Sequence, residues 1–112
     1  MIQSRGRLPK CPVEVTLYAV GTRWKILILR DLMDGKKRFG ELQRSIGGIS
    51  QKVLTQQLRA MEEDGLVERT VHPVIPPHVE YSLTETGRSL KPILDAMWAW
   101  GEEYREKHPE KI

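Results

Sequence analysis

In the middle of the chain, hydrophobic residues recur at the spacing of two consecutive helices. The apolar positions are Phe39, Leu42 and Ile46 in the first helix, and Leu54, Leu58 and Met61 in the second. Gly47 and Gly48 between the helices can adopt positive φ at little cost, which allows a tight turn. Ser50 is a good N-cap for the second helix, and Gly65 is the residue type expected just after a helix ends. The pattern predicts a helix-turn-helix over about residues 39–64.

Two further helices are predicted before this pair. Pro12 suits the first position of a helix, which places Cys11 at its N-cap or near it, and the helix ends at Gly21. Residues 23–34 follow as a second helix that is apolar on almost every side. A helix of this kind is typical of the centre of a core.

After Gly65 the hydrophobic period changes from 3.6 to 2. Residues 67–71 and 79–83 alternate between apolar and polar positions, as two strands do. The segment between them contains three prolines, which cannot continue a strand ladder. We therefore predict a hairpin, or wing, at about residues 66–83. Lys36–Arg38, ahead of the helix-turn-helix, is either a short edge strand or a loop.

The last predicted helix starts near Thr84, runs to about Lys107 and has a broad apolar face. That face contains Leu90, Ile93, Leu94, Met97, Trp98, Trp100 and Tyr104. It is wider than one core-facing stripe requires, and an exposed apolar face of this kind usually marks a partner. We expect the partner to be a second copy of the chain. The alternative is that the face packs wholly inside one subunit.

With 112 residues, the chain is predicted to fold as one domain over residues 11–112, after a flexible basic arm at residues 1–10. The predicted fold class is α+β, mainly α with a small β-hairpin: a winged helix-turn-helix. The net charge is only +3, but residues 23–59 hold nine Lys or Arg against three acids. A basic region beside an otherwise acidic remainder favours a polyanionic partner such as double-stranded DNA.

The outer side of the second helix of the pair is suited to DNA recognition. It offers three Gln and one Thr, with no acid before Glu62, whereas an ordinary solvated face, the alternative interpretation, is usually crowded with Glu and Lys. Gln pairs with adenine, Lys reaches guanine or phosphate, and Thr contacts a base edge or a thymine methyl group. The residues expected to contact bases are Ser50, Gln51, Lys52, Thr55 and Gln56. Those expected to contact the DNA backbone are Lys25, Lys36, Lys37, Arg38, Arg44 and Arg59.

Other classes of function find less support. No Ser–His–Asp order, catalytic carboxylate pair or Gly-rich phosphate loop occurs, so we expect neither an enzyme nor a cofactor. His72 and His78 flank the wing loop, and with His108 their spacing makes no metal site on any single element. We therefore expect no metal. No apolar run exceeds five residues, far short of a membrane span, and no signal-peptide pattern is present. A cytoplasmic protein without membrane contact is expected.

The serious competitor is a winged helix that serves as a protein-protein interaction module without specific DNA binding. Such a module would lose the cations of its second helix and expose Leu or Phe there. This chain keeps Lys52 and Arg59 and adds the three cations of Lys36–Arg38. DNA binding is the interpretation that these residues favour.

The chain has a single cysteine, so it can form no internal disulfide and no Cys-based zinc framework. Cys11 lies at a predicted helix N-terminus beside Lys10, a setting that favours a reactive thiolate. The other interpretation is an inert, partly buried thiol that packs. The residues alone leave both open.

Taken together, these motifs resemble the HxlR-type family of bacterial winged-helix regulators, which are related to the MarR group. The resemblance rests on Cys11-Pro12, Trp24-Lys25, Arg38-Phe39, Glu41-Leu42, Gly48-Ile49-Ser50, Leu54, Leu58, Asp64-Gly65-Leu66-Val67, Pro76-Pro77, Val79-Glu80-Tyr81-Ser82-Leu83-Thr84 and Gly87. Two places depart from the family pattern. Residues 21–23 are Gly-Thr-Arg where the family often has Gly-Gly-Lys, and His78 stands where the wing commonly ends in Arg or Lys.

The resemblance implies a homodimeric transcriptional regulator that is joined through its first and last helices. Leu17 of the first helix would then belong to the interface, and the expected DNA site is a palindromic operator. We expect binding near a promoter to repress transcription; activation is the alternative, and the sequence does not choose between them. Several members of the family respond to oxidants or electrophiles through a cysteine like Cys11, so an oxidant or small-molecule effector is a further expected partner.

Overall fold

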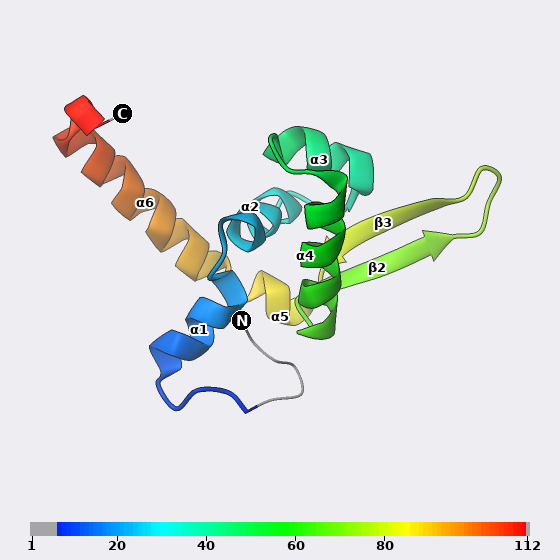
Figure 1. Cartoon of the computed structure of the whole chain (residues 1–112), viewed down its shortest axis with the longest axis horizontal. Coiled ribbons are helices and arrows are strands. Elements are labelled where there is room, and N and C mark those ends of the chain that lie inside the picture. The colour runs from blue at the N-terminus through cyan, green and yellow to red at the C-terminus, as the bar shows by residue number, and fades with distance from the viewer. Residues whose placement is uncertain (1–6, 112) are drawn as a thin grey trace.

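A computed structural model describes residues 7–111. Six α-helices and a small sheet make up this part of the chain (Figure 1). The helices are α1 (Pro12–Val20), α2 (Arg23–Leu32), α3 (Phe39–Ile46), α4 (Gln51–Glu63), α5 (Glu85–Arg88) and α6 (Lys91–Lys107), followed by a 3-10 turn at Pro109–Lys111. The strands are β1 (Lys37–Arg38), β2 (Val67–His72) and β3 (His78–Leu83). The predicted winged helix-turn-helix, mainly α with a small hairpin, is confirmed. The first six residues of the predicted basic arm lie outside the described part.

The helix-turn-helix consists of α3 and α4, and its turn has the predicted chemistry. Gly47 and Gly48 adopt φ of 72° and 70°, a region that costs glycine little. The Ser50 hydroxyl accepts a hydrogen bond from the Val53 amide at 3.1 Å and so caps the first turn of α4. These two local features fix where α4 begins and therefore which side of it faces outward.

The sheet is antiparallel in the order β1-β3-β2, so the segment before α3 is an edge strand and not a loop. Val67 pairs with Leu83 at one end of the hairpin, and His72 pairs with His78 at the other. The Val67 and Leu83 end is buried, whereas the His72 and His78 end projects from the body of the molecule (Figure 1).

The core lies where α2, α3, α4 and the buried end of the hairpin meet. Its fully buried side chains are Ile28, Leu29, Leu42, Leu54, Leu58, Met61 and Val67. A polar clamp joins α2 to α3 at the edge of this core. Asp31, itself buried, accepts hydrogen bonds from Arg30 Nε at 2.7 Å and from Ser45 Oγ at 2.6 Å. The bond to Asp31 raises the pKa of Arg30.

The predicted single helix from residue 84 to 107 is wrong, because the chain breaks between α5 and α6. Pro92 lies in the first turn of α6. Proline has no N–H to continue a helical hydrogen-bond ladder, so its presence favours a new helix start. Thr84 caps α5 as expected, accepting from the Gly87 amide at 3.0 Å. Its hydroxyl also donates to the Gly65 carbonyl at 2.6 Å and so joins α5 to the end of α4.

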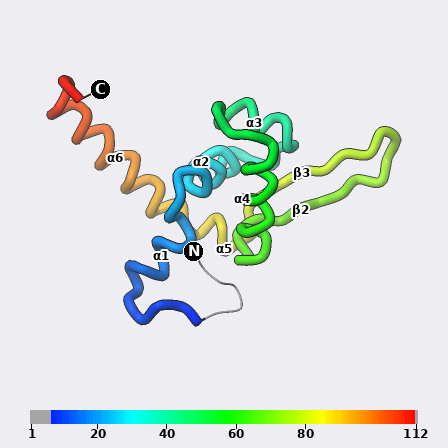
Figure 2. Tube along the Cα trace, in the orientation of Figure 1, coloured from blue at the N-terminus to red at the C-terminus, as the bar shows by residue number. Residues whose placement is uncertain are grey.

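The described residues extend 52 × 35 × 24 Å. The Cα trace shows α6 leaving the body at one end of the long axis while the hairpin leaves at the other (Figure 2). No helix within residues 7–111 has the length and apolar character needed to cross a bilayer.

Candidate nucleic-acid interface

The outer face of α4 gathers all five residues that we expected to contact bases. Together with Arg59 they line one open groove on the surface: Ser50, Gln51, Lys52, Thr55, Gln56 and Arg59. Leu54, Leu58 and Met61 point from the opposite side of the helix into the core. Because one side of α4 is held by the core, the polar side is presented as a fixed surface and not as a mobile loop.

Two hydroxyls on this face already make hydrogen bonds to the backbone. The Thr55 hydroxyl donates to the Gln51 carbonyl at 2.8 Å, so its oxygen stays available only as an acceptor. The Ser50 oxygen accepts from the Val53 amide, so its own proton can still be donated. Gln51, Lys52 and Gln56 are exposed and make the most adaptable contacts of the set.

Gln57 is one of the three Gln residues that we expected on the outer face of α4, but it does not belong to this face. Its side chain is half-buried, and its Oε1 accepts from the Thr22 hydroxyl at 3.4 Å. Thr22 is the N-cap of α2. Gln57 therefore connects α4 to the start of α2 and is turned away from any ligand on the outer face.

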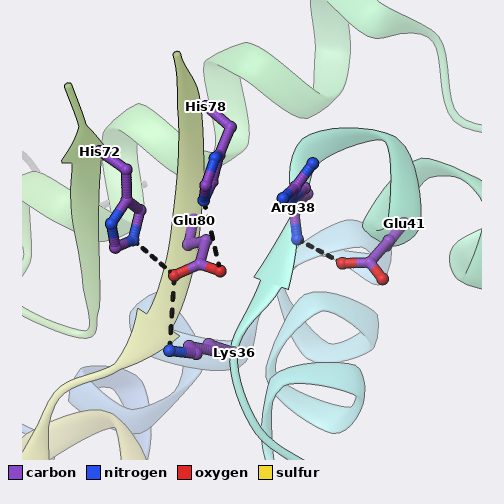
Figure 3. Close-up of polar contacts among 6 residues, drawn as sticks. All are labelled: Lys36, Arg38, Glu41, His72, His78 and Glu80. Carbon is purple, nitrogen blue, oxygen red and sulfur yellow. Dashed lines mark hydrogen bonds and ion pairs between the residues drawn. The ribbon is translucent and has the colours of Figure 1, made fainter. Parts of the chain in front are cut away.

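Most of the cations expected at the DNA backbone are accessible. Lys36, Arg38, Arg44 and Arg59 are exposed, and Lys37 is half-buried in the edge strand. The Arg38 amide donates to the Glu41 carboxylate at 2.8 Å, which fixes the start of α3 (Figure 3). That bond uses the backbone of Arg38 and leaves its guanidinium at the surface.

The prediction that Lys25 contacts the DNA backbone is wrong, because this residue is only 3% exposed and cannot reach a phosphate. Its Nζ donates to the Tyr18 carbonyl of α1 at 3.2 Å. Lys25 precedes Ile28 and Leu32 at helical spacing, so it lies on the buried stripe of α2; that spacing could have shown its burial. Burial raises the pKa of Asp64, and the nearby charge of Lys25 opposes this rise.

Arg69 is a cation that sequence reasoning missed. It lies on β2 beside Arg59 of α4, and both line a second hollow between the helix and the sheet, with Thr55, Leu58, Glu62 and Tyr81. Alternate residues of a strand share one face, so Val67, Arg69 and Val71 all face the same way. Since Val67 is buried in the core, Arg69 had to lie on the side of the sheet that α4 covers.

The two wing histidines are not spread along the loop but lie against each other. Their ring centroids are 4.5 Å apart, and both face the carboxylate of Glu80 (Figure 3). His72 Nε2 lies 2.7 Å from Glu80 Oε1, His78 Nε2 lies 3.8 Å from Oε2, and Lys36 Nζ lies 3.6 Å from Oε1. The hydrogen bond with His72 lowers the pKa of Glu80, and Lys36 acts in the same direction. The sequence analysis considered only single elements, whereas the pairing of β2 with β3 brings His72 and His78 together from two strands.

The apolar face predicted on the last helix is divided between the core and the surface. Leu90 is only 9% exposed and belongs to the core, and Ile93 and Leu94 pack against it, so these three do not form an open interface. Farther along α6, Trp98 and Trp100 are 63% and 66% exposed. The other expected interface residues, Leu17, Met97 and Tyr104, are also exposed. The first two turns of α6 thus attach it to the body, and the rest carries aromatic side chains into solvent.

Cys11 lies at the N-cap of α1 and is exposed, so the interpretation as a buried packing thiol is wrong. Its side chain makes no capping hydrogen bond. The thiol is therefore accessible to a reagent or to a second protein molecule.

A helix-turn-helix followed by an antiparallel hairpin, with a polar, cation-bearing second helix, defines a winged-helix transcriptional regulator. The match to known proteins agrees with this class. A model described as the HxlR-like helix-turn-helix matches residues 19–109, and the chain belongs to that family.

Several relatives are similar over most of their length. The uncharacterized HTH-type transcriptional regulator YdeP of Bacillus subtilis (strain 168) is 50% identical over 97 residues, which cover 87% of this chain and 76% of that protein. The solved structure of the redox regulator HypR in its oxidized form is 52% identical, with a TM-score of 0.79, over 83% of this chain and 96% of that one. The reduced form of HypR is 48% identical, with a TM-score of 0.84, over 89% of this chain and 99% of that one.

Proposed function

We propose that this transcriptional regulator is a homodimeric repressor that binds a palindromic operator through α4. The observation that carries the proposal is the outer face of α4, where five side chains able to contact bases share one groove with Arg59. A recognition helix enters the major groove with its N-terminal residues foremost. Gln51, Lys52, Thr55 and Gln56 all fall in the first two turns of α4, where such contacts are made.

Each residue on this face has a chemical role in the proposal. Gln51 and Gln56 pair with adenine through their amide groups, and Lys52 donates to guanine or to phosphate. Thr55, whose hydroxyl proton is held by Gln51, accepts from a base amino group and offers its methyl group to thymine. Lys36, Lys37, Arg38, Arg44 and Arg59 contact phosphates, which position the protein without specifying sequence.

The proposed dimer brings the outer part of α6 and the exposed side of α1 against a second copy. Trp98, Trp100 and Leu17 are exposed there as large apolar side chains. A two-fold axis through this region would place two copies of α4 in successive major grooves, about 34–36 Å apart. The operator would then be a palindrome with half-sites one helical turn apart. Occupying such a site at a promoter would block polymerase.

The first experiment selects duplexes from a randomised pool and measures their binding by fluorescence anisotropy at fixed salt. Q51A and Q56A should each lose about 1–3 kcal/mol of binding free energy on the selected site. Binding to a random duplex should change little, because these side chains specify sequence. The control K107A changes an exposed cation far along α6 and should bind both duplexes normally. Equal losses on selected and random DNA would contradict base recognition, and failure to enrich any sequence would favour an interaction module.

We further propose that Cys11 is the site of an oxidant response, as the similarity to a protein described as a redox regulator suggests. Two exposed Cys11 thiols from two subunits can join as a disulfide, giving two electrons and two protons to an oxidant such as diamide. The product would be a covalent dimer on a non-reducing gel, with altered operator affinity. C11S should show neither change. If C11S loses DNA affinity under diamide as the unchanged protein does, Cys11 is not the sensor.

A further inference from the structure

We propose that His72, His78 and Glu80 form a binding site for a divalent transition-metal ion of the Zn²⁺ class, at the outer end of the wing hairpin. One ligand atom from each of the three residues can be chosen so that all lie within 4.8 Å of one another. The site belongs to the hairpin alone and does not depend on the proposed DNA contact.

The strand register is what assembles the three ligands. His72 and His78 are directly opposite each other as the last and first residues of β2 and β3. Glu80 lies two residues beyond His78, and the pleat of a strand puts residues two apart on the same face. All three side chains therefore emerge on one face of the sheet, opposite to the face that α4 covers at Arg69.

The distances suit a small ion. Zn²⁺ binds imidazole nitrogen and carboxylate oxygen at about 2.0–2.2 Å, so ligand atoms of a tetrahedral site lie about 3.3 Å apart. His72 Nε2 and Glu80 Oε1 are 2.7 Å apart, and His78 Nε2 and Oε2 are 3.8 Å apart. These two distances end on different oxygens of Glu80, and a set with one ligand atom from each residue lies within 4.8 Å. Side-chain rotations that bring one carboxylate oxygen between the two imidazole nitrogens would give the tetrahedral separation. The ion would take the place of the hydrogen bond, with each imidazole presenting the lone pair of Nε2 and keeping its proton on Nδ1.

The ligand set also selects the class of ion. Two imidazoles and one carboxylate suit Zn²⁺ and its neighbours, whereas Mg²⁺ and Ca²⁺ prefer oxygen ligands. The side chains of His72, His78 and Glu80 are 36%, 25% and 18% exposed, so an ion can enter from solvent without unfolding the hairpin. Three protein ligands leave a fourth position for water.

Lys36 is the only described cation paired with Glu80 besides the two histidines, and it does not block the site. Its Nζ lies 3.6 Å from Glu80 Oε1, and its side chain is 67% exposed. A flexible, solvated lysine can move aside when a divalent ion takes the carboxylate. The bound ion would then join the ends of the two strands across the proline-containing loop and make the wing tip a closed structure.

The test is Zn²⁺ titration of the full chain by isothermal calorimetry in a non-coordinating buffer at pH 7.5. We expect one ion for each chain and a dissociation constant in the micromolar range or below. H72Q and H78Q should each weaken binding at least tenfold. H108Q and C11S should bind as the unchanged protein does; they remove the remaining histidine and the thiol, the other strong zinc ligands in the sequence. Mg²⁺ should give no heat of binding.

Circular dichroism of the variants checks that H72Q and H78Q remain folded, as expected for side chains outside the core. Replacing Zn²⁺ by Co²⁺ supplies a second measurement, since a tetrahedral site with two nitrogen ligands gives strong visible absorption bands that the two variants should lose. The proposal is overturned if about 100 µM Zn²⁺ does not saturate a site on the unchanged protein, a weak affinity for a protein zinc site. It is also overturned if H72Q or H78Q weakens Zn²⁺ binding by less than tenfold. It is also overturned if C11S abolishes the binding.

Discussion

The Thr84 hydroxyl holds together the end of α4, the start of the wing and α5, and its removal gives a sharp test of the fold. It donates to the Gly65 carbonyl at 2.6 Å and accepts from the Gly87 amide at 3.0 Å. T84V keeps the shape of the side chain and removes both bonds. Loss of an N-cap costs about 0.5–2 kcal/mol, and loss of a neutral hydrogen bond about 0.5–1.5 kcal/mol.

The two losses do not simply add, because Gly65 is exposed and water can replace the hydroxyl at its carbonyl. We therefore expect T84V to reduce the free energy of unfolding by about 1–2 kcal/mol. This corresponds to a fall in Tm of about 4 °C or more for a domain of this size. The Thr84 amide, which donates to the Leu66 carbonyl at 3.0 Å, is unchanged by the substitution.

The assay is urea unfolding followed by circular dichroism, at one protein concentration because self-association would contribute to stability. T84S keeps the hydroxyl and should stay within about 0.5 kcal/mol of the unchanged protein. T86V alters an exposed threonine two residues away and controls for the added methyl group. If T84V proves as stable as T84S, the hydroxyl does not join these elements and the reasoning fails.

Three further predictions concern other parts of the structure. G87A should lower the free energy of unfolding by about 1–3 kcal/mol, because a Cβ there would lie 2.2 Å from the Leu66 carbonyl oxygen. A Cβ at Gly101 would meet nothing within 4 Å, so G101A should be neutral or stabilising. Thermal melts compare the two variants, and equal Tm values would contradict this. D31N should lower the free energy of unfolding, measured in urea, by about 1–3 kcal/mol, since the Asp31 carboxylate accepts hydrogen bonds from both Arg30 and Ser45. The same substitution should cost less in an S45A background, where one of these bonds is already absent. Burial raises the pKa of Asp64, so the folded protein holds its proton more tightly, and the stability contributed by Asp64 falls as pH rises from the unfolded pKa near 3.8 through the raised folded pKa. The stability of D64N minus that of the unchanged protein should therefore increase with pH over that window, and a flat or falling difference would refute the shift.

Local signals in the sequence were enough to predict the helix-turn-helix. The N-cap at Ser50, the Gly47-Gly48 turn and the apolar stripe of α4 depend on residues close together in the chain, so they can be found without tertiary information. The outer face of α4 follows from that stripe, because residues opposite a buried face must point outward. The groove of expected base contacts was predictable for this reason.

Three features of the structure that were not predicted from the sequence have different causes. The charge of Lys25 suggested a surface position, but its place on the buried stripe of α2 decided its burial. The cluster of His72, His78 and Glu80 depends on the pairing of β2 with β3, and a shift of one residue in that register would separate the ligands. The break before α6 had a local sign in Pro92, which the wide hydrophobic pattern around it obscured.

The placement of α6 and the hairpin at opposite ends of the molecule has a mechanical consequence. Over the 52 Å long axis, a rotation of about 5° at one end carries the other end through about 4 to 5 Å, a scale of motion familiar from subunit rotations. Successive base pairs are only about 3.4 Å apart. A tilt of this size in α6, relative to a partner surface packed on its tryptophans, would thus move the wing tip by more than the spacing of two adjacent base pairs. The distance between the two ends therefore converts a small rotation of α6 into a displacement of the wing tip that exceeds the spacing of base pairs.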